Sequence, residues 1–484
     1  MGRLILFSPV GGTDPTSYDN GRDGSLIHIC RFYQPTDILL YMSGEILRNQ
    51  EKDDRYIYFL KKLYAQRRKT IRTNSFILNH NYQECVDKLF EKSDQEGTEE
   101  GGSQIHICEI QRPDLERVEQ FDPFYNEYRG IVREVFRHVK DGDQVLFNVS
   151  SGTPAMKSAL MVIGTLGEFP VRMIQVATPV KGMNEHNHVD YDVELAWECD
   201  EDNDPGKVQN RCSEVHCPAL LVIKNEEIIR GLVRAYDYDA ALSVANSMSA
   251  TYTKTYIDLL DLASKRLLFD FREVDRLSRD AGYDSTPVKS GDTRKCFEYA
   301  LSVQIKWKKK EYADFTRALT PLIADLFETV LRQFGANAGI EQYTRVRHVG
   351  DERIREWDER MLRGSETYQV LNDYYSQTTR SEFHCGPVYS DHLAVLIRHY
   401  ATNDRVVALV DNLRMVESKV RNMAAHEIVS VTASLIRERT GFSGDQILKM
   451  IRELFRFSNN AIRDQYWNSY DDLNQEIFRR LSST

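Results

Sequence analysis

The order of apolar segments along the chain constrains its fold more than any other feature. Over roughly the first two hundred residues, short apolar runs such as RLILFSPV, DILLYMS, QVLFNVS and VRMIQVA alternate with longer amphipathic stretches such as PFYNEYRGIVREVFRHV. Apolar strands separated by helices need crossover connections, which produce a mainly parallel sheet covered on both faces. Beyond this region almost every segment repeats at the period of a helix. The sequence therefore predicts an α/β Rossmann-like domain followed by all-α regions.

Two breaks in the pattern divide the chain further. The acidic, turn-rich run CDEDNDPGK covers 199–207, and the small-residue run GANAGI covers 335–340. A chain of 484 residues is too long for a single core, so several domains are expected. We predict an α/β domain at 1–205, an all-α connector at 206–338 and a second all-α domain at 339–484.

The composition argues against several classes of protein. No apolar run approaches the roughly 18 residues of a membrane-spanning helix, and the N-terminal apolar stretch is too short for a secretory signal. The eight cysteines are scattered, as in a reduced cytoplasmic protein, and RCSEVHC (Cys212, His216, Cys217) lacks the paired spacing of a zinc site. A net charge of −10 argues against general DNA coating. We expect a cytoplasmic protein without membrane or stable DNA binding.

Two turns that follow predicted strands are rich in Gly, Ser and Thr. SPVGGTDP covers 8–15, and NVSSGTPAMKS covers 148–158 and runs directly into a predicted helix. Ligands of open α/β sheets bind at the carboxyl ends of the strands, and the free N–H groups at a helix start suit phosphate. Neither turn matches GxGxxG or GxxxxGK[ST], which disfavours an NAD enzyme or an ATPase. Ordinary tight turns with good helix caps are the alternative interpretation.

A predicted helix near the C-terminus carries a cation, an amide and an imidazole among small residues. In KVRNMAAHEI, Asn422 and His426 are four residues apart and share a face, whereas Arg421 is rotated from His426 by about 140°. The same Arg-x4-His spacing occurs twice more, at Arg133 and His138 and at Arg211 and His216. Spacing alone is therefore uninformative, and a buried polar cluster on a packed helix is an alternative explanation.

Taken in this order, the segments resemble the CRISPR-associated type III-A accessory ribonucleases, which join a CARF sensor domain to a HEPN nuclease domain. SPVGGTDP, NVSSGTPAMKSAL and YDVELAWECDEDND lie in the α/β half, and RNMAAH fits the RNxxAH form of the HEPN motif. The resemblance implies that the CARF half binds a cyclic oligoadenylate activator and that the HEPN half cuts single-stranded RNA. Cyclic hexa-adenylate is favoured over tetra-adenylate, and the helices between the two halves are similar to the family's connector.

The resemblance also implies roles for individual residues. The activator contacts would be Gly11, Gly12, Thr13 and Asp14 in the first turn and Ser150, Ser151, Gly152 and Thr153 in the second. The nuclease residues would be Arg421, Asn422 and His426. In members whose CARF half slowly cleaves its own activator, Thr153 would take part. The other two Arg-x4-His pairs are then expected to be surface pairs.

RNA carries its own nucleophile, the 2′-OH, so such an enzyme needs to move protons and stabilise charge. His426 would transfer protons near neutral pH, Arg421 would stabilise charge on the phosphate, and Asn422 would orient the imidazole or hold the phosphate. No carboxylate cluster accompanies RNMAAH in the sequence, so we expect cleavage without metal or catalytic cofactor. The small residues Ala424 and Ala425 would let two copies of the helix approach, which predicts a homodimer.

Two other functions remain compatible with parts of the pattern. A ligand-responsive transcription regulator would join the same sensor to a basic helix-turn-helix and would bind duplex DNA. A non-enzymatic, ligand-gated adaptor would use RNMAAH only for packing. Incubation with labelled single-stranded RNA, with and without cyclic oligoadenylate, separates all three.

Overall fold

The structure is a computed structural model that describes the backbone of most of the chain. The described ranges are 2–17, 21–79, 81–90, 104–115, 117–167, 169–179, 191–289, 291–334, 340–349, 352–426, 430–458 and 462–482. The side chains of residues 85, 88, 349, 352, 353 and 421–426 lie outside the description. The polar, Gly-rich sequence of 91–104 predicts a loop, and this stretch falls almost entirely outside the description. The chain divides into two compact units, Met1–Lys224 and Asn225–Thr484.

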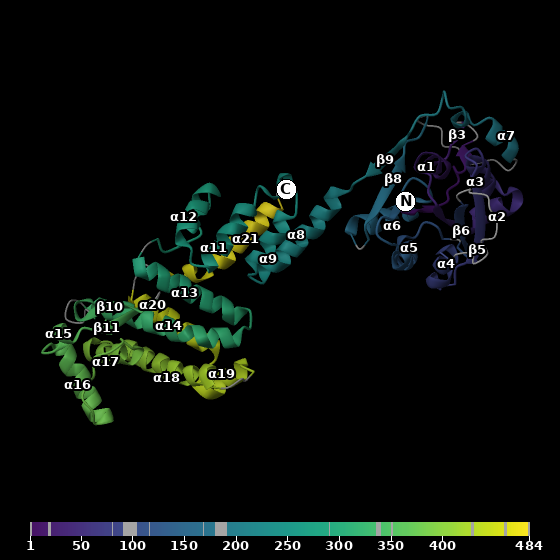
Figure 1. Ribbon diagram of the computed structural model, residues 1–484. Helices are drawn as coiled ribbons and strands as arrows, with labels where there is room; N and C mark the ends of the chain where they lie inside the picture. The colour runs from purple at the N-terminus through teal and green to yellow at the C-terminus, as the bar shows by residue number, and fades with distance from the viewer. Residues whose placement is uncertain are drawn as a thin grey trace. The chain divides into compact units, whose positions relative to one another are not determined.

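The first unit has the predicted α/β fold with a mainly parallel sheet, and this sheet contains seven strands (Figure 1). The strand order is β5-β6-β4-β1-β7-β8-β9, and every neighbouring pair is parallel except β8 with β9. The bounds are β1 Leu4–Pro9, β4 Asp37–Ser43, β5 Thr70–Ile77, β6 Gln104–Arg112, β7 Gln144–Asn148, β8 Val171–Val176 and β9 Cys212–Val215. A separate short hairpin joins β2 (Thr16–Ser17) to β3 (Arg22–Asp23).

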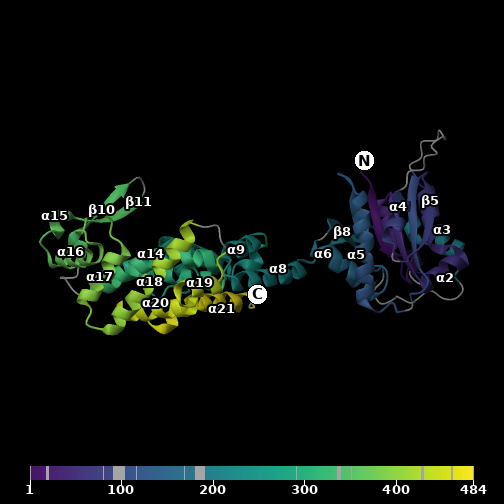
Figure 2. The ribbon, with the colours of Figure 1, turned by 90° about the horizontal axis from the view of Figure 1, so that it is seen from below.

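Helices cover both faces of this sheet, because consecutive side chains of a strand point to opposite faces. Ile5 and Phe7 of β1 belong to one hydrophobic cluster, whereas Leu6 between them belongs to another. The first cluster includes α4 (Tyr82–Phe90), α5 (Phe121–His138) and α6 (Pro154–Leu166). The second includes α1 (Ser25–Tyr33), α2 (Gly44–Asp53), α3 (Arg55–Ala65) and α7 (Val193–Glu198), and Figure 2 gives a second view of these layers.

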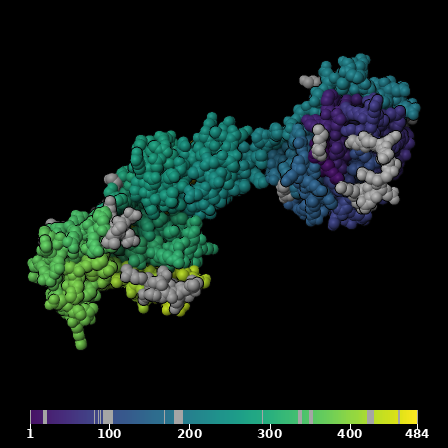
Figure 3. All heavy atoms as spheres, viewed as in Figure 1, coloured from purple at the N-terminus to yellow at the C-terminus, as the bar shows by residue number. Residues whose placement is uncertain are grey.

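The described residues of the second unit are helical apart from connecting turns and one hairpin. Its elements are α8 Pro218–Arg234, which begins in the first unit, α9 Tyr238–Asn246, α10 Ala250–Thr253, α11 Ile257–Leu267, α12 Phe271–Asp280, α13 Gly291–Lys308, α14 Tyr312–Leu331, α15 Glu359–Leu362, α16 Glu366–Thr379, α17 Ser390–Tyr400, α18 Asp404–His426, α19 Ala433–Thr440, α20 Gly444–Ser458 and α21 Ser469–Leu481. The hairpin, β10 (Thr344–Val349) with β11 (Glu352–Trp357), was not predicted. In the space-filling view α15 and α16, in green, stand at one end of this unit (Figure 3).

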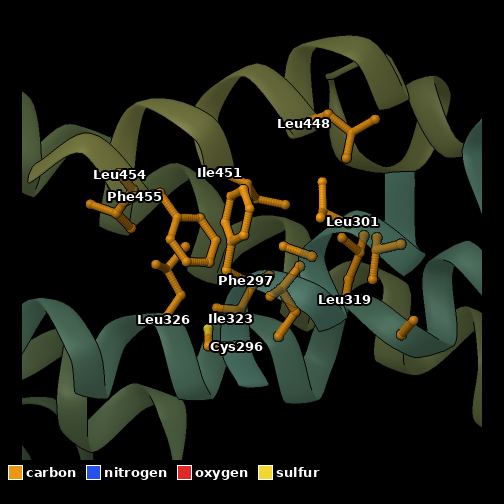
Figure 4. Close-up of a cluster of buried hydrophobic side chains, with 14 of the residues drawn as sticks. Cys296, Phe297, Leu301, Leu319, Ile323, Leu326, Leu448, Ile451, Leu454 and Phe455 are labelled. Atoms are coloured by element: carbon orange, nitrogen blue, oxygen red, sulfur yellow. The ribbon is translucent and has the colours of Figure 1, made fainter. Parts of the chain in front are cut away.

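One hydrophobic core runs through the second unit. Figure 4 shows Phe297 of α13 among apolar side chains of α14 and α20, and its ring meets that of Phe455 edge to face at 5.6 Å between centroids. The ranges predicted as separate domains, 206–338 and 339–484, therefore contribute to the same core from residue 229 onward. Among the described helices none is long and apolar enough to cross a membrane.

Two long predicted helices are shorter in the structure. The sequence pattern predicts one helix over SGEILRNQEKDDRYIYFLKKLYAQ, but the structure divides it at Asp54, whose φ of 53° ends α2 before α3 begins. The stretch running from α18 to RER is also divided, because α18 ends at His426 and residues 430–432 are not helical. Val431 and Thr432 are β-branched, which lowers helix propensity, and the Thr432 hydroxyl accepts the Leu435 N–H at 3.2 Å to start α19.

Candidate functional site

The two predicted ligand turns start from neighbouring strands. β1 pairs with β7 in parallel, with Phe7 opposite Phe147, so the turns that follow them leave the same edge of the sheet. Asn148, the last residue of β7, donates from Nδ2 to the hydroxyl of Ser8 at 3.0 Å and to that of Ser25 at 3.2 Å. Asn148 was not among the predicted site residues. A buried amide at the end of an apolar strand was the available signal.

Glycine allows the two turns to touch. A Cβ at Gly11 would lie 2.8 Å from the backbone nitrogen of Gly152, closer than real Cβ atoms approach. Gly152 has a φ of +86°, and a Cβ there would lie 2.9 Å from Cβ of Pro9 and 2.9 Å from Sδ of Met156. Both predicted turns are therefore held in one close contact that other residues would disturb.

Asp14 lies behind this contact and holds both turns. Its side chain is buried and accepts the N–H of Gly11 at 3.2 Å, the N–H of Leu26 at 3.0 Å and the hydroxyl of Ser151. Burial raises the pKa of the Asp14 carboxyl. Ser151 is buried as well. Of the eight predicted contact residues, these two shape the turns from inside.

The other six predicted residues are partly exposed: Gly11, Gly12, Thr13, Ser150, Gly152 and Thr153. Ser150 is tied to β8, because its hydroxyl accepts the Val176 N–H at 2.8 Å. The Thr153 hydroxyl accepts the Met156 N–H at 3.4 Å, which caps α6, and donates to the Val118 carbonyl at 2.7 Å. The N-terminal end of α6 directs its positive dipole end at this turn.

A second polar cluster in the first unit has the residue types of a metal site, but two guanidinium groups contact its carboxylates. Asp23, His28 and Asp202 are buried close together. Arg31 donates to both carboxylate oxygens of Asp23, at 2.6 and 2.8 Å. Arg211 donates to Asp202 at 2.9 Å. Because guanidinium groups already neutralise these carboxylates, we assign no metal to this cluster.

The other two Arg-x4-His pairs can now be placed. His138 lies at the end of α5, where it contacts Asp87 at 2.9 Å and stacks on the Phe90 ring at 4.8 Å between centroids. Arg211 does not form the predicted surface pair with His216. Its side chain is only 13% exposed and is turned into the first unit, where buried Asp202 attracts it. The expectation of a surface pair is wrong for Arg211.

The predicted nuclease residues lie on α18. Apolar side chains along this helix are buried, and α18 packs against α14, α17 and α20. Glu417 is also buried and accepts the Ser390 hydroxyl at 2.5 Å and the Arg414 guanidinium at 3.3 Å. The backbone of Arg421, Asn422 and His426 is helical, but their side chains lie outside the described residues. Their roles stay predictions.

Family models match this chain in three consecutive segments. The Cas_Csm6 CARF domain matches residues 107–212, the CRISPR-associated protein Csm6 6H domain matches 215–267, and the Cas_Csm6 HEPN domain matches 285–478. The order agrees with an α/β unit followed by helices.

Similar proteins span the whole chain. "CRISPR system endoribonuclease Csm6" of Mycobacterium tuberculosis (strain ATCC 25618 / H37Rv) is 27% identical over 483 residues, covering 99% of each protein. "CRISPR system endoribonuclease Csm6′" of Streptococcus thermophilus is 24% identical over 484 residues, covering 99% of this chain and all of the relative. A solved structure of Enterococcus italicus Csm6, bound to cyclic hexa-2′-fluoro-hexa-dAMP, superposes with a TM-score of 0.62 at 16% identity. It covers 99% of this chain and 100% of that one. This likeness shows a shared fold.

The fold and the three matched segments define a CRISPR-associated protein with a CARF domain and a HEPN domain. The chain belongs to the Csm6 family.

Proposed function

We propose that this chain is an endoribonuclease that cuts single-stranded RNA when a cyclic oligoadenylate binds its CARF domain. The observation that carries the proposal is the contact between the turns at Gly11 and Gly152. This contact lies at the carboxyl ends of the strands, where ligands of open α/β sheets bind. The same chain also contains the RNMAAH motif. The relatives named as endoribonucleases support the reaction class. The Enterococcus italicus protein bound to a cyclic hexa-adenylate analogue supports the activator class.

The activator would lie against the exposed parts of the two turns. The partly exposed turn at Gly152, the positive end of α6 and the Thr13 side chain offer polar contacts to phosphate and ribose groups. Asp14 and Ser151 would act by holding this surface in shape. We favour cyclic hexa-adenylate because of the analogue bound to the Enterococcus italicus relative. Cyclic tetra-adenylate is the alternative ring.

RNA cleavage would use the 2′-OH as nucleophile. His426 would take or give the protons, Arg421 would stabilise charge on the phosphate oxygens, and Asn422 would position the imidazole or the phosphate. Attack of the 2′-oxygen on phosphorus releases the 5′-oxygen of the next nucleotide. The products would carry 2′,3′-cyclic phosphate and 5′-hydroxyl ends.

The test is cleavage of labelled single-stranded RNA by the full chain, with cyclic hexa-adenylate, with cyclic tetra-adenylate and without either. We expect ring-dependent cleavage by the wild type and a loss of about 10²-fold or more in His426→Ala, the range for removing a proton-transfer group. His138→Ala is the control, because both His138 and its contact Asp87 lie in the first unit, away from the predicted nuclease helix in the sequence. RNA left intact with both rings, or cleavage at the wild-type rate by a folded His426→Ala protein, would overturn the proposal.

The same assay tests the chemistry. Activity should persist in EDTA, because the nucleophile is the 2′-OH of the substrate and the proposed proton carrier is the imidazole of His426. An RNA with a single 2′-deoxy nucleotide should be spared at that linkage, and DNA should stay uncut. If EDTA stops cleavage and added Mg²⁺ or Mn²⁺ restores it, attack by metal-activated water must replace this mechanism.

A further inference from the structure

The second pocket turn is bonded directly to the end of β8. The Ser150 hydroxyl accepts the Val176 N–H at 2.8 Å and lies 3.5 Å from the Val176 carbonyl, to which it donates. Val176 is the last residue of β8 and pairs with Cys212 of β9. A displacement of Ser150 would therefore act directly on the paired strands β8 and β9.

Arg211, just before β9, fastens this strand pair to the rest of the first unit. Its carbonyl accepts the Ala177 N–H at 3.0 Å, and its Nη1 donates to the Ala177 carbonyl at 2.9 Å. Its Nη2 donates to the Asp23 carbonyl and to Asp202, each at 2.9 Å. Its own N–H donates to Nε2 of His28 at 3.0 Å. One residue thus joins the end of β8 to β3, α1 and the acidic run.

The groups that hold Arg211 are themselves anchored. Asp202 also accepts Arg22 at 2.8 Å, and its second oxygen accepts the Asp23 N–H at 3.1 Å. Burial alone would raise the pKa of Asp202, but hydrogen bonds from His28, Arg211 and Arg22 hold it well below its ordinary value. Asp202 is therefore charged at neutral pH. Arg211 is therefore held by the buried carboxylate of Asp202. Removing the guanidinium would leave this carboxylate with fewer partners, which costs free energy in a buried site.

The chain leaves the first unit directly beyond this point. β9 ends at Val215, and α8 begins at Pro218 and crosses the division between the units after Lys224. Since each unit is one continuous range of residues, the covalent connection between them lies within α8, and β9 is the last strand before it. Figure 1 labels β9 and α8.

We propose that Arg211 is a positioning residue that transmits the occupancy of the CARF pocket to the helical unit through β9 and α8. The inference rests on the proposed function, because it assigns a route to the activation stated there. A ring seated on residues 150–153 would alter the bonds between Ser150 and Val176. Arg211 makes the end of β8, β9 and the start of α1 move as one body, so the change reaches α8. Without Arg211 the ring still binds, but β9 no longer follows the pocket.

The test compares ring affinity with ring stimulation in full-length Arg211→Met. We expect the affinity for cyclic hexa-adenylate to stay within about threefold of wild type, while RNA cleavage at saturating ring falls by about tenfold, within the usual range of allosteric coupling. A defect in the pocket itself would be recovered at saturation, and this defect would not. The matched control is Arg172→Met, because Arg172 also links β8 to β9, through exposed Glu214 at 3.2 Å. It should keep full stimulation.

Hydrogen exchange gives a readout that does not depend on cleavage. In the wild type, the ring should slow amide exchange at 150–153 and at 211–215, whereas in Arg211→Met only the first segment should respond. Should Arg211→Met fail to fold, Arg211→Lys serves in its place, since a single ammonium keeps the charge but cannot reach all three acceptors.

Full stimulation in a folded Arg211 variant, or equal loss in Arg172→Met, would overturn the coupling role alone. A wild type that neither ring stimulates would overturn the proposed function, and this inference with it.

Discussion

Among single residues, the acids of the run at 199–207 show how far burial can change the meaning of a sequence. Because the run is acidic and rich in turn formers, it was interpreted as a break between domains. In the structure Asp200 and Asp202 are buried, at 3% and 1% exposed; Asp202 accepts the Arg211 guanidinium at 2.9 Å, and Asp200 accepts the Asp202 N–H at 2.9 Å. The boundary prediction used their polarity, but their anchoring role depends on arginines that are distant in the sequence.

Asp200 leads to a prediction about pH. Burial, and then the charge of Asp23, raise the pKa of its carboxyl from 3.8 to about 8. Between about pH 4 and pH 8 the folded state therefore keeps a proton that the unfolded state has lost, so its contribution to stability falls as pH rises. Asp200→Asn removes this titration and keeps the oxygen that accepts the Asp202 N–H at 2.9 Å. We expect the variant to melt higher, by about 2–4 °C per kcal/mol gained.

The diagnostic feature is the pH dependence of that difference in thermal unfolding. It should widen from pH 5 to pH 8 and level off above. Asp204→Asn is the control from the same run, because Asp204 is exposed and its Oδ1 accepts the Gly206 N–H at 2.8 Å. A difference that stays constant with pH, or that is equal in the control, would contradict the assignment to Asp200.

Individual elements were predictable where their pattern was apolar. RLILFSPV, DILLYMS and QVLFNVS became β1, β4 and β7, because central strands of a parallel sheet are buried on both faces. VRMIQVA became β8, which is only partly buried. β5 was missed because it is an edge strand, TIRTNSFI, with several polar and exposed positions. The hairpin β10–β11 was missed because TRVRHV and ERIREW are rich in charge. These elements depend on a neighbouring strand that local sequence does not reveal.

The candidate site was predictable to a similar extent. Both turns were found because they are rich in Gly, Ser and Thr and follow predicted strands. In the structure the two turns are in contact. Which side chains face outward was not predictable, because Asp14 is buried by bonds to Leu26 and Ser151, which lie in other elements. The nuclease motif was located by its resemblance to a family, since its spacing also occurs at Arg133 and at Arg211.

At the scale of a secondary-structure element, the turn before α6 is tested by replacing Gly152. Gly152→Ala should cost about 1 kcal/mol for its positive φ and should also push the turns apart, because its Cβ would meet Pro9. We expect affinity for cyclic hexa-adenylate to fall by about tenfold or more, measured by direct titration. Gly167→Ala is the matched control at the other end of α6. It has a φ of +77°, and a Cβ there would meet no described atom within 4 Å. Equal affinities in the two variants would contradict this placement of the pocket.

At the scale of the whole molecule, the proposed route of activation enters the core that also contains α18, the helix with the predicted nuclease residues. Ile229 and Val233 of α8 and Val416 and Val420 of α18 are buried in one continuous cluster. Closely packed interiors transmit small displacements because they leave little free volume. A movement of α8 would therefore act on a body that includes α18, without a separate connector core to absorb it.

The last prediction concerns assembly. One chain offers one His426 and one Arg421, and two-fold pairing would place two of each around one groove, with Ala424 and Ala425 allowing close approach. Light scattering of the active, ring-bound protein should give twice the 56.1 kDa mass of the chain.

Mixed dimers test whether the two copies share that groove. Wild-type and His426→Ala chains with different tags are co-expressed, and the mixed dimer is isolated through both tags. Two independent sites would leave half of the wild-type rate. A shared groove that needs both imidazoles should leave about a tenth or less, because removal of one proton carrier costs about 10²-fold or more. A mixed dimer that keeps half of the rate, or an active monomer, would rule out the composite groove.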